Sequence, residues 1–357
     1  MASMEPVQSL LSILEQRLGT NWSQLKAASE RAEAKRRKLR FALKGIDSDD
    51  TSVVVFGSLG RNEFTEASDI DWTLLIDGGA DPMHLELTRK IADEVKALSS
   101  KAVGREGLFG SMTFSHDLVH QIGGEDDTNR NTTRRILLLL ESKVVGREEA
   151  YDRVISQILK RYVLEDQGFV KGTGKYHVPR FLLNDFARNW WTMAVDFAYK
   201  KRTRFGQGAA IRNIKLRFSR KLIYVSGLLT CFGCHMVLDD LKPTGVCPGT
   251  GSSPDCVECL HRRLQRTPID ILIDALLHLR HMDETAKKIL SAYDGFLGIL
   301  ADETSRNCLQ ELDSDNESDK TFSYARELSH EFRDGLMDLF FDQKSQMYEL
   351  TKNYGVF

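Results

Sequence analysis

The feature that most constrains this 357-residue chain is the segment 57–71, which reads GSLGRNEFTEASDID. The β-branched run 52–56 before it and the apolar run 72–76 after it each predict a strand. A glycine followed by a serine at the end of a strand lets backbone amides and a hydroxyl approach phosphate oxygens. The segment therefore predicts a phosphate-binding turn between two strands, with Gly57 and Ser58 as its binding residues.

Two aspartates, Asp69 and Asp71, end this segment. At the start of a strand they would point to the same side, with Ile70 in the core, because side chains alternate. Neighbouring carboxylates repel each other and are stable as anions only with a cation between them. Mg²⁺ suits such ligands and also takes phosphate oxygens. We therefore expect Asp69 and Asp71 to be catalytic ligands of Mg²⁺ or Mn²⁺, although a turn capped by Asp69 is an alternative.

The pattern GSxGRxExxxxSDxD resembles the signature of the DNA polymerase β-like nucleotidyltransferase superfamily. The variant with Arg61 and Glu63 is similar to the branch that contains the bacterial PII-uridylyltransferases and their stand-alone relatives. The resemblance is sharpest over residues 52–77, weaker over 131–146 and loose over 183–229. It implies a mixed-sheet catalytic lobe, a helical lobe that holds the nucleotide, and transfer of a nucleoside monophosphate from a nucleoside triphosphate to a hydroxyl. We expect Arg61 and Glu63 to brace the loop rather than to contact the substrate.

The resemblance also implies a third carboxylate on a later strand. We expect that strand within residues 111–122 and take Asp117 as the third catalytic and metal-binding carboxylate. Glu125, Asp126 and Asp127 are rivals for this role, because they follow a Gly-Gly pair directly after the predicted strand.

Residues 200–221 contain nine basic residues and no acidic residue. At helical spacing Lys215 and Ser219 share one face, whereas Arg217 and Lys221 share another. A surface helix with solvated cations is one interpretation, but the lack of balancing acids favours phosphate binding. We expect Lys215 and Lys221 to contact the nucleotide, and the remaining basic face could meet an acidic acceptor or a nucleic-acid backbone.

Two CxxC pairs raise the hypothesis of a structural zinc site. Cys231 and Cys234 form one pair, and Cys256 and Cys259 form the other, separated by a Pro- and Gly-rich loop. Four thiolates can close a tetrahedral zinc site. The alternative is that the first pair lies at the end of an apolar helix, where small buried cysteines are common.

The predicted fold class is α+β, with a small mixed-sheet nucleotidyltransferase catalytic lobe and a larger all-helical lobe. We assign residues 1–48 to an N-terminal helical extension, 49–165 to the catalytic domain and 166–357 to a helical domain that binds nucleotide and substrate. Two irregular segments, 241–253 and 303–320, are expected to interrupt the helices.

Three local expectations concern the N-terminal half. Residues 4–44 show helical periodicity. The mixed-sign run 30–40 within them is interpreted as a solvated helix face rather than a nucleic-acid arm. A short helix is expected over residues 63–67.

The composition excludes several classes of protein. The net charge of −2 means that attraction to nucleic acid or to a membrane has to come from a local patch. The sequence contains no secretory signal pattern and no run of about 18 apolar residues, so no membrane span or membrane partner is expected. Six cysteines in a chain of this length fit a reducing compartment, and the predicted location is cytoplasmic.

The acceptor hydroxyl is not specified by the segment 57–71. One hypothesis is template-independent synthesis of an oligonucleotide signal, in bacterial stress or antiviral defence. A second is uridylylation or adenylylation of a protein, and a third is transfer to RNA ends, which the basic stretch permits. A non-catalytic binding module is disfavoured, because both Asp69 and Asp71 are present. The oligomeric state is not predicted.

Overall fold

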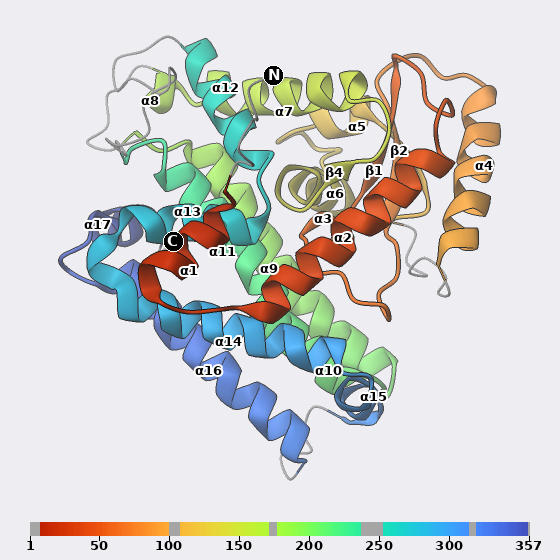
Figure 1. The fold of residues 1–357 in the computed structure, drawn as a ribbon. Helices are drawn as coiled ribbons and strands as arrows, with labels where there is room; N and C mark the ends of the chain where they lie inside the picture. Colours follow the sequence, from red (N-terminus) through yellow and green to blue (C-terminus); the bar gives the residue numbers. More distant parts are fainter. Residues whose placement is uncertain (1–7, 100–107, 171–176, 237–252, 314–318, 356–357) are drawn as a thin grey trace, which may run out of the picture.

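The computed structural model combines one small sheet with many helices (Figure 1). It describes residues 8–99, 108–170, 177–236, 253–313 and 319–355. The described strands are β1 (Thr51–Val55), β2 (Trp72–Ile76), β3 (Ser111–Phe114) and β4 (Lys143–Val144). Their order in the sheet is β3-β2-β1-β4. The β1 strand is antiparallel to β2 and β4, whereas β2 and β3 are parallel. This mixed sheet with a larger helical region confirms the predicted fold class.

Helices surround the sheet and form the rest of the described chain. Those up to the end of the predicted catalytic lobe are α1 (Leu10–Leu18), α2 (Ser23–Ala42), α3 (Gly57–Gly60), α4 (Met83–Leu98), α5 (Ser115–Val119), α6 (Asn129–Leu140) and α7 (Glu149–Glu165). Those that follow are α8 (Gln167–Val170), α9 (Arg180–Thr203), α10 (Ala209–Lys215), the π-helix η1 (Leu216–Arg220), α11 (Lys221–Phe232), α12 (Ser253–Leu264), α13 (Pro268–His278), η2 (Arg280–Met282), α14 (Asp283–Ala301), α15 (Glu303–Glu311), α16 (Lys320–Phe341), α17 (Gln346–Leu350) and η3 (Thr351–Gly355).

Both faces of the sheet are covered, which explains why every residue of β1 and β2 is buried. On one face Val53 and Val55 belong to a core that includes residues of α2 and α4. On the other face Val54 belongs to a larger core that includes α6, α7 and the later helices. The sheet therefore shares its apolar core with the helical region.

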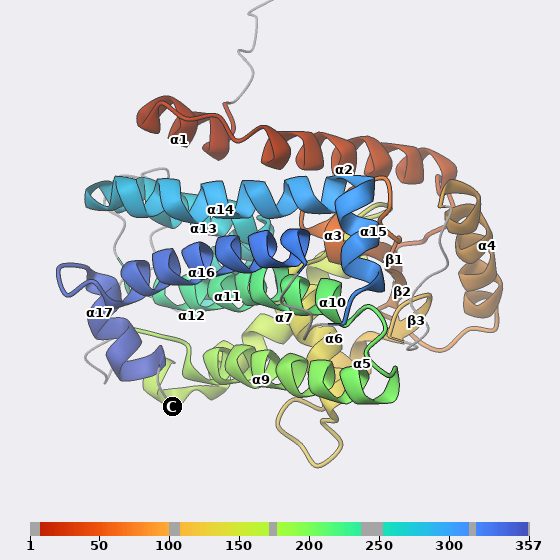
Figure 2. The same cartoon turned by 90° about the horizontal axis from the view of Figure 1, so that it is seen from below.

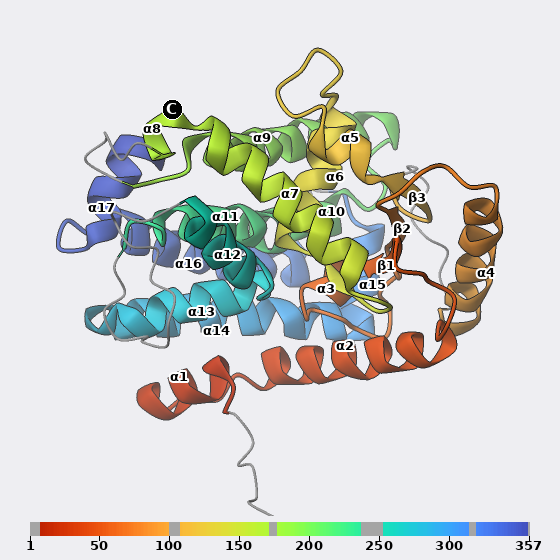
Figure 3. The ribbon, with the colours of Figure 1, turned by 90° about the horizontal axis from the view of Figure 1, so that it is seen from above.

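Helix α2 bridges the two parts of the molecule. It packs against α14 of the helical region and against α3 and α4 beside the sheet. Figure 2 shows α2 and α14 side by side along one side of the molecule, with α9 on the opposite side. Figure 3 shows the same relation from above. The division into 1–48, 49–165 and 166–357 remains our proposal, with α2 in contact with both lobes.

The helical periodicity over residues 4–44 corresponds to the two helices α1 and α2, because Gly19 ends α1 in the left-handed conformation (φ 63°). Several other local expectations were wrong. The short helix lies at α3 rather than at residues 63–67. The predicted third strand ends at Phe114, where α5 begins. Part of the segment 303–320 is helical, because Asp302 caps α15. Residues 241–252 of the other predicted irregular segment lie outside the described residues, and Ser253 begins α12.

The charged run on α2 is not simply a solvated face. The Nη1 atom of Arg36 donates to the Leu59 carbonyl at 2.6 Å, and Nζ of Lys35 donates to the Leu98 carbonyl at 3.0 Å. Arg36 is 5% exposed. A long cationic side chain can bury its stem while its head bonds to a carbonyl, and charge patterning alone does not reveal such contacts.

Within the described parts of the chain, no helix is both long and apolar enough to cross a membrane.

Candidate functional site

The turn after β1 needs glycine at two positions. Gly57 has a φ of 63°, in the region that favours glycine, and a Cβ atom there would lie 2.8 Å from Oδ2 of Asp71. A Cβ atom at Gly60 would collide with the Glu141 carbonyl oxygen. The turn therefore lies directly against Asp71, and Ser58 is half-buried beside it.

Asp69 and Asp71 lie just before β2, where the extended backbone continues. The Phe56 amide donates to the Asp71 carbonyl at 2.9 Å, which extends the β1–β2 pairing by one step. Ile70 is buried at 1% exposure, whereas both flanking aspartates are half-buried. Burial, and then the charges of Asp69 and Glu141, raise the pKa of Asp71 to about 7. The structure thus brings the two predicted aspartates together as mutually repelling carboxylates.

Glu141 is a third carboxylate at this place, and the sequence analysis did not assign it. It follows α6, is 2% exposed, and forms ion pairs with Arg61 and with Arg220, whose Nη1 lies 3.5 Å from Oε2. Its other oxygen, Oε1, is buried without a hydrogen-bond partner. The available signal was the segment 131–146, over which the sequence resembles the superfamily and within which Glu141 lies.

Lys215 and Arg220 bring positive charge to the aspartates. Burial and the neighbouring Arg306 lower the pKa of Lys215 to about 8, whereas the charge of Asp69 opposes this shift. The charge of Arg220 acts on both Asp71 and Lys215. Lys215 directly precedes the π-helix η1, and Arg220 is its last residue. Because η1 closes i→i+5 hydrogen bonds, residues five apart come closer to one face than an α-helix allows.

Lys221 lies in a different environment. Burial and the charges of Arg217 and Arg333 lower its pKa, and Asp334 opposes this effect. Arg333 and Asp334 belong to α16. The structure therefore groups Lys215 with the aspartates and Lys221 with α16.

Arg61 and Glu63 hold the loop from within. They form an ion pair with 2.9 Å between Nη2 and Oε2, and both are almost fully buried. Glu63 also accepts hydrogen bonds from Ser219 Oγ at 2.8 Å and from the Tyr293 hydroxyl. These contacts agree with the prediction that the pair braces the loop, and they tie the loop to η1 and α14.

Two further arginines brace the loop from outside the catalytic lobe's sheet. Arg36 of α2 donates to Oδ1 of Asn62 at 2.8 Å, and Asn62 has a left-handed φ of 63°. Arg306 of α15 donates to the Ala67 carbonyl at 2.7 Å and to Thr65. The segment 57–71 is therefore held by α2 and α15, which are more than 200 residues apart in the chain.

Asp117 lies on α5 and is half-buried. Its charge acts on Arg134. Burial and the charge of Arg130 lower the pKa of Arg134, and the charge of Asp117 opposes this shift. Of its rivals, Glu125 and Asp126 are exposed.

The remaining rival, Asp127, is held in a buried network. It accepts from Nη1 and Nη2 of Arg135 at 3.1 and 2.8 Å, and Arg135 Nη2 also donates to Asp185 at 3.2 Å. The pKa of Asp127 is lower than usual. Burial alone would raise it, but the hydrogen bonds from Arg135 and from the Gly123 amide outweigh the effect of burial. Arg135 therefore links α6 to α9, and Asp127 is its structural counter-charge.

The donor set at the aspartates fits a hard divalent cation. Asp69 and Asp71 offer carboxylate oxygens that repel each other without a cation, and the buried Oε1 of Glu141 has no partner. Among the described residues, no group of three or more His, Cys, Asp or Glu side chains is arranged to hold a metal ion. Mg²⁺ is commonly bound through one or two carboxylates together with substrate phosphates and water, so the pair is sufficient.

Among the residues that the structure describes, the four cysteines do not form a group that could hold a metal ion, and the zinc site stays a hypothesis. Cys231 lies in the last turn of α11 and Cys234 just after its end, whereas Cys256 and Cys259 both lie in α12. The Sγ of Cys234 donates to the Thr230 carbonyl, and the Sγ of Cys256 lies 3.7 Å from Nε2 of His177. Burial raises the pKa of Cys231 well above its usual value, as expected for a thiol in an apolar helix contact.

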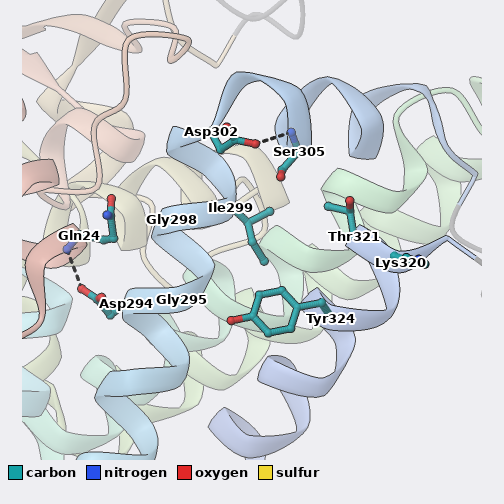
Figure 4. Close-up of a pocket in the computed structure, with 10 residues that line it drawn as sticks. All are labelled: Gln24, Asp294, Gly295, Gly298, Ile299, Asp302, Ser305, Lys320, Thr321 and Tyr324. Carbon is teal, nitrogen blue, oxygen red and sulfur yellow. Dashed lines mark hydrogen bonds between the residues drawn. The ribbon is translucent and has the colours of Figure 1, made fainter.

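An open pocket of about 490 Å³ lies between α2, α14, α15 and α16 (Figure 4). Its two carboxylates serve as helix caps: Asp294 accepts from the Gln24 amide at 2.9 Å, and Asp302 accepts from the Ser305 amide at 2.8 Å. None of the predicted site residues lines this pocket.

The raised pKa of Asp71 predicts a pH-dependent stability. The folded protein retains a proton on Asp71 up to about pH 7, whereas the unfolded chain loses it near pH 4, so this group destabilises the fold as pH rises through that window. Without divalent cations at pH 8, the free energy of unfolding of Asp71→Asn should be about 2 kcal/mol higher than that of the wild type.

This difference should vanish as the pH is lowered to about 4, as measured by urea unfolding across the range. The exposed substitution Asp338→Asn controls for effects of amide substitution elsewhere in the chain. A gap between Asp71→Asn and the wild type that is the same at both pH values would contradict the prediction.

Comparison with known proteins agrees with this geometry. Residues 36–106 match the family model of the nucleotidyltransferase domain, which covers the end of α2, the 57–71 loop, β2 and α4. No curated protein and no solved structure matches the chain. The branch that resembles the PII-uridylyltransferases remains a prediction. The chain therefore contains a nucleotidyltransferase domain of the polymerase β-like superfamily and is a transferase of nucleotidyl groups.

Proposed function

We propose that this protein transfers a nucleoside monophosphate from a nucleoside triphosphate to an acceptor hydroxyl, with Mg²⁺ or Mn²⁺ as cofactor. The observation that carries the proposal is the position of Asp69 and Asp71 directly against the Gly57 turn, with Lys215 and Arg220 beside them. Anionic metal ligands, a phosphate-binding turn and cations in one place are what nucleotidyl transfer requires.

Each residue of the candidate site has a separate role in the proposed reaction. Gly57 allows close approach of the backbone, and the Ser58 hydroxyl is available for a phosphate oxygen. Lys215 and Arg220 stabilise negative charge on the triphosphate. The acceptor oxygen forms a bond to the α-phosphorus, the bond to pyrophosphate breaks, and the hydroxyl proton passes to a carboxylate. The divalent cation, when bound, stabilises charge on the attacking and leaving oxygens.

Two residues compete for the role of the third carboxylate. Asp117 is the one that the family pattern suggests, and Glu141 is favoured by its position beside Asp71. The variants Asp117→Asn and Glu141→Gln distinguish these two residues. Loss of the residue that accepts the proton should change the pH dependence of kcat. Loss of a carboxylate with a structural role should change stability instead.

Incubation with each labelled nucleoside triphosphate and Mg²⁺ or Mn²⁺, first alone and then with cell lysate, tests the proposal. Label in free oligonucleotides would support synthesis of a signal for stress or antiviral defence, and label in a protein band or in RNA would support the alternatives. If no label is incorporated and no pyrophosphate is released under any of these conditions, the proposed function is wrong.

The position of Lys215 gives a prediction for nucleotide binding. Lys215→Ala should raise the KM for the nucleoside triphosphate about tenfold or more, because a half-buried cation beside the aspartates is lost. Lys221→Ala is the matched comparison on the same helical stretch. Its charged neighbours on α16 predict a change in KM within about twofold, and steady-state kinetics of both variants will decide between the two lysines.

A further inference from the structure

Helix α9 changes character halfway along its length. Its first half buries one face, with Leu182, Leu183 and Phe186 almost fully inaccessible. Over residues 190–203 no side chain is buried, although this half contains two tryptophans, a phenylalanine and a tyrosine. Helical stability normally comes from burial of an apolar face, but here the packed side chains are only half-buried and several large apolar ones are exposed, which favours a surface that another molecule covers.

The exposed apolar residues form one stripe. Trp191, Val195 and Tyr199 follow each other at i, i+4 and i+8, and their exposed fractions are 67%, 68% and 54%. By contrast, the neighbouring Trp190 stacks on Tyr224 with 5.8 Å between ring centroids. The stripe therefore presents two large rings to solvent, about two helical turns apart.

The stripe continues into the basic stretch 200–221. The guanidinium of Arg202 lies 5.7 Å from the centroid of the Tyr199 ring. The one acidic residue of the exposed half, Asp196, pairs with Lys200. Farther along the same stretch are Lys215 and Arg220, which lie beside Asp69 and Asp71, and η1 packs against α9. Positive charge thus continues from the aromatic stripe to the candidate site.

The turn after α9 adds a third exposed ring. Phe205 has a left-handed φ of 50° and is 96% exposed. A bulky residue in this conformation is strained, and its exposed ring gains nothing from packing within the chain. Because the left-handed conformation of Phe205 is strained and its ring is exposed, this side chain is better suited to contact a ligand than to stabilise the fold.

We propose that the exposed half of α9 is the docking surface for a single-stranded nucleic-acid acceptor, whose bases stack on Trp191 and Tyr199. Exposed rings beside a track of cations are the arrangement by which proteins hold single strands without reading their sequence. The phosphates lie along cations of the basic stretch toward Lys215, Arg220 and the aspartates. This inference rests on the proposed function and specifies the acceptor as a single strand, whether an RNA end or a growing oligonucleotide. The charge excess favours it over a protein acceptor.

Fluorescence anisotropy with a labelled single-stranded RNA of about 15 nucleotides tests the surface, since such sites span roughly 4–16 nucleotides. Trp191→Ala and Tyr199→Ala should each weaken binding about tenfold, and Tyr199→Phe should bind like the wild type because the ring is retained. Phe41→Ala is the matched control, because Phe41 is 85% exposed on α2, on the opposite side of the molecule (Figure 2). All three side chains are at the surface, so the four variants should fold.

Three outcomes would overturn the inference. One is equal binding of the strand by the wild type, Trp191→Ala and Tyr199→Ala. Another is equal affinity for a duplex of the same sequence, whose bases are not free to stack on the rings. The third is a change of oligomeric state in Trp191→Ala on size-exclusion chromatography, which would assign the stripe to contact between copies of this chain.

Pyrophosphate release separates this inference from the proposed function. If the wild type releases pyrophosphate in the presence of any acceptor but binds no single strand, the docking surface is wrong and the proposed function stands. If it binds the strand through the stripe but releases no pyrophosphate with any nucleotide, the docking surface stands and the proposed function is wrong.

Discussion

Asp71→Asn should lower the rate of nucleotidyl transfer at least about a thousandfold and leave the fold intact. The substitution keeps the shape of the side chain but removes the negative charge that would hold the divalent cation. A metal ion contributes several kcal/mol of charge stabilisation in the transition state, and about 4 kcal/mol corresponds to a factor of a thousand. The measurement is the initial rate of pyrophosphate release with saturating nucleotide and Mg²⁺.

The same variant separates chemistry from stability, because relief of the repulsion from Asp69 and Glu141 should stabilise the protein without metal. Asp338→Asn on α16 is the control, since Asp338 is exposed and pairs with Lys288. Asp69→Asn should show a similar loss of rate. Activity of Asp71→Asn within about tenfold of the wild type would remove this residue from the catalytic centre.

Arg61→Ala should destabilise the protein by about 3–5 kcal/mol, because it removes the cation that two buried carboxylates share and leaves only Glu141 with an ion pair, to Arg220. Arg61 pairs with Glu63 and Glu141, and all three side chains are less than 10% exposed. Loss of one partner leaves an uncompensated charge in the interior, which costs more than the pair itself contributes. Urea unfolding monitored by tryptophan fluorescence measures the change.

Arg153→Ala is the matched control for this prediction. Arg153 also pairs with two carboxylates, Asp50 and Asp77, but its side chain is 43% exposed. Exposed pairs contribute about 0–1 kcal/mol, so this variant should remain close to the wild type. If Arg61→Ala were no more destabilising than Arg153→Ala, the buried network would not hold the loop. Adding Glu63→Gln to Arg61→Ala should recover part of the loss, because one stranded charge becomes neutral.

The sequence by itself determined the part of the site that is contiguous in the chain. Strand periodicity around the segment 57–71 predicted β1 and β2, and the alternation of Asp69, Ile70 and Asp71 predicted a buried residue between two accessible carboxylates. These features are local consequences of the two-residue period of a strand and of the steric freedom of glycine. The α+β class followed from the same strands and from helical periodicity in the later half.

Periodicity failed where the local geometry departs from the ideal. The face assignment of the basic stretch assumed α-helical spacing, but the π-helix η1 changes that spacing between Lys215 and Arg220. The strand expected to continue through Asp117 ends at Phe114, because four residues of β3 complete the pairing with β2 and α5 then begins. Neither departure has a strong signature in a single sequence.

Only the tertiary structure decided which distant residues surround the carboxylates. Glu141 follows α6, Arg36 lies on α2 and Arg306 lies on α15, yet all three contact residues 57–71 or their ion-pair partners. A buried charge needs a counter-charge or a hydrogen-bond partner, which can come from any part of the chain that the fold brings close. No rule of sequence spacing relates such partners. The sequence therefore specified the reacting segment, because its chemistry is local, whereas the residues that hold it and carry its counter-charges were selected by packing across the whole chain.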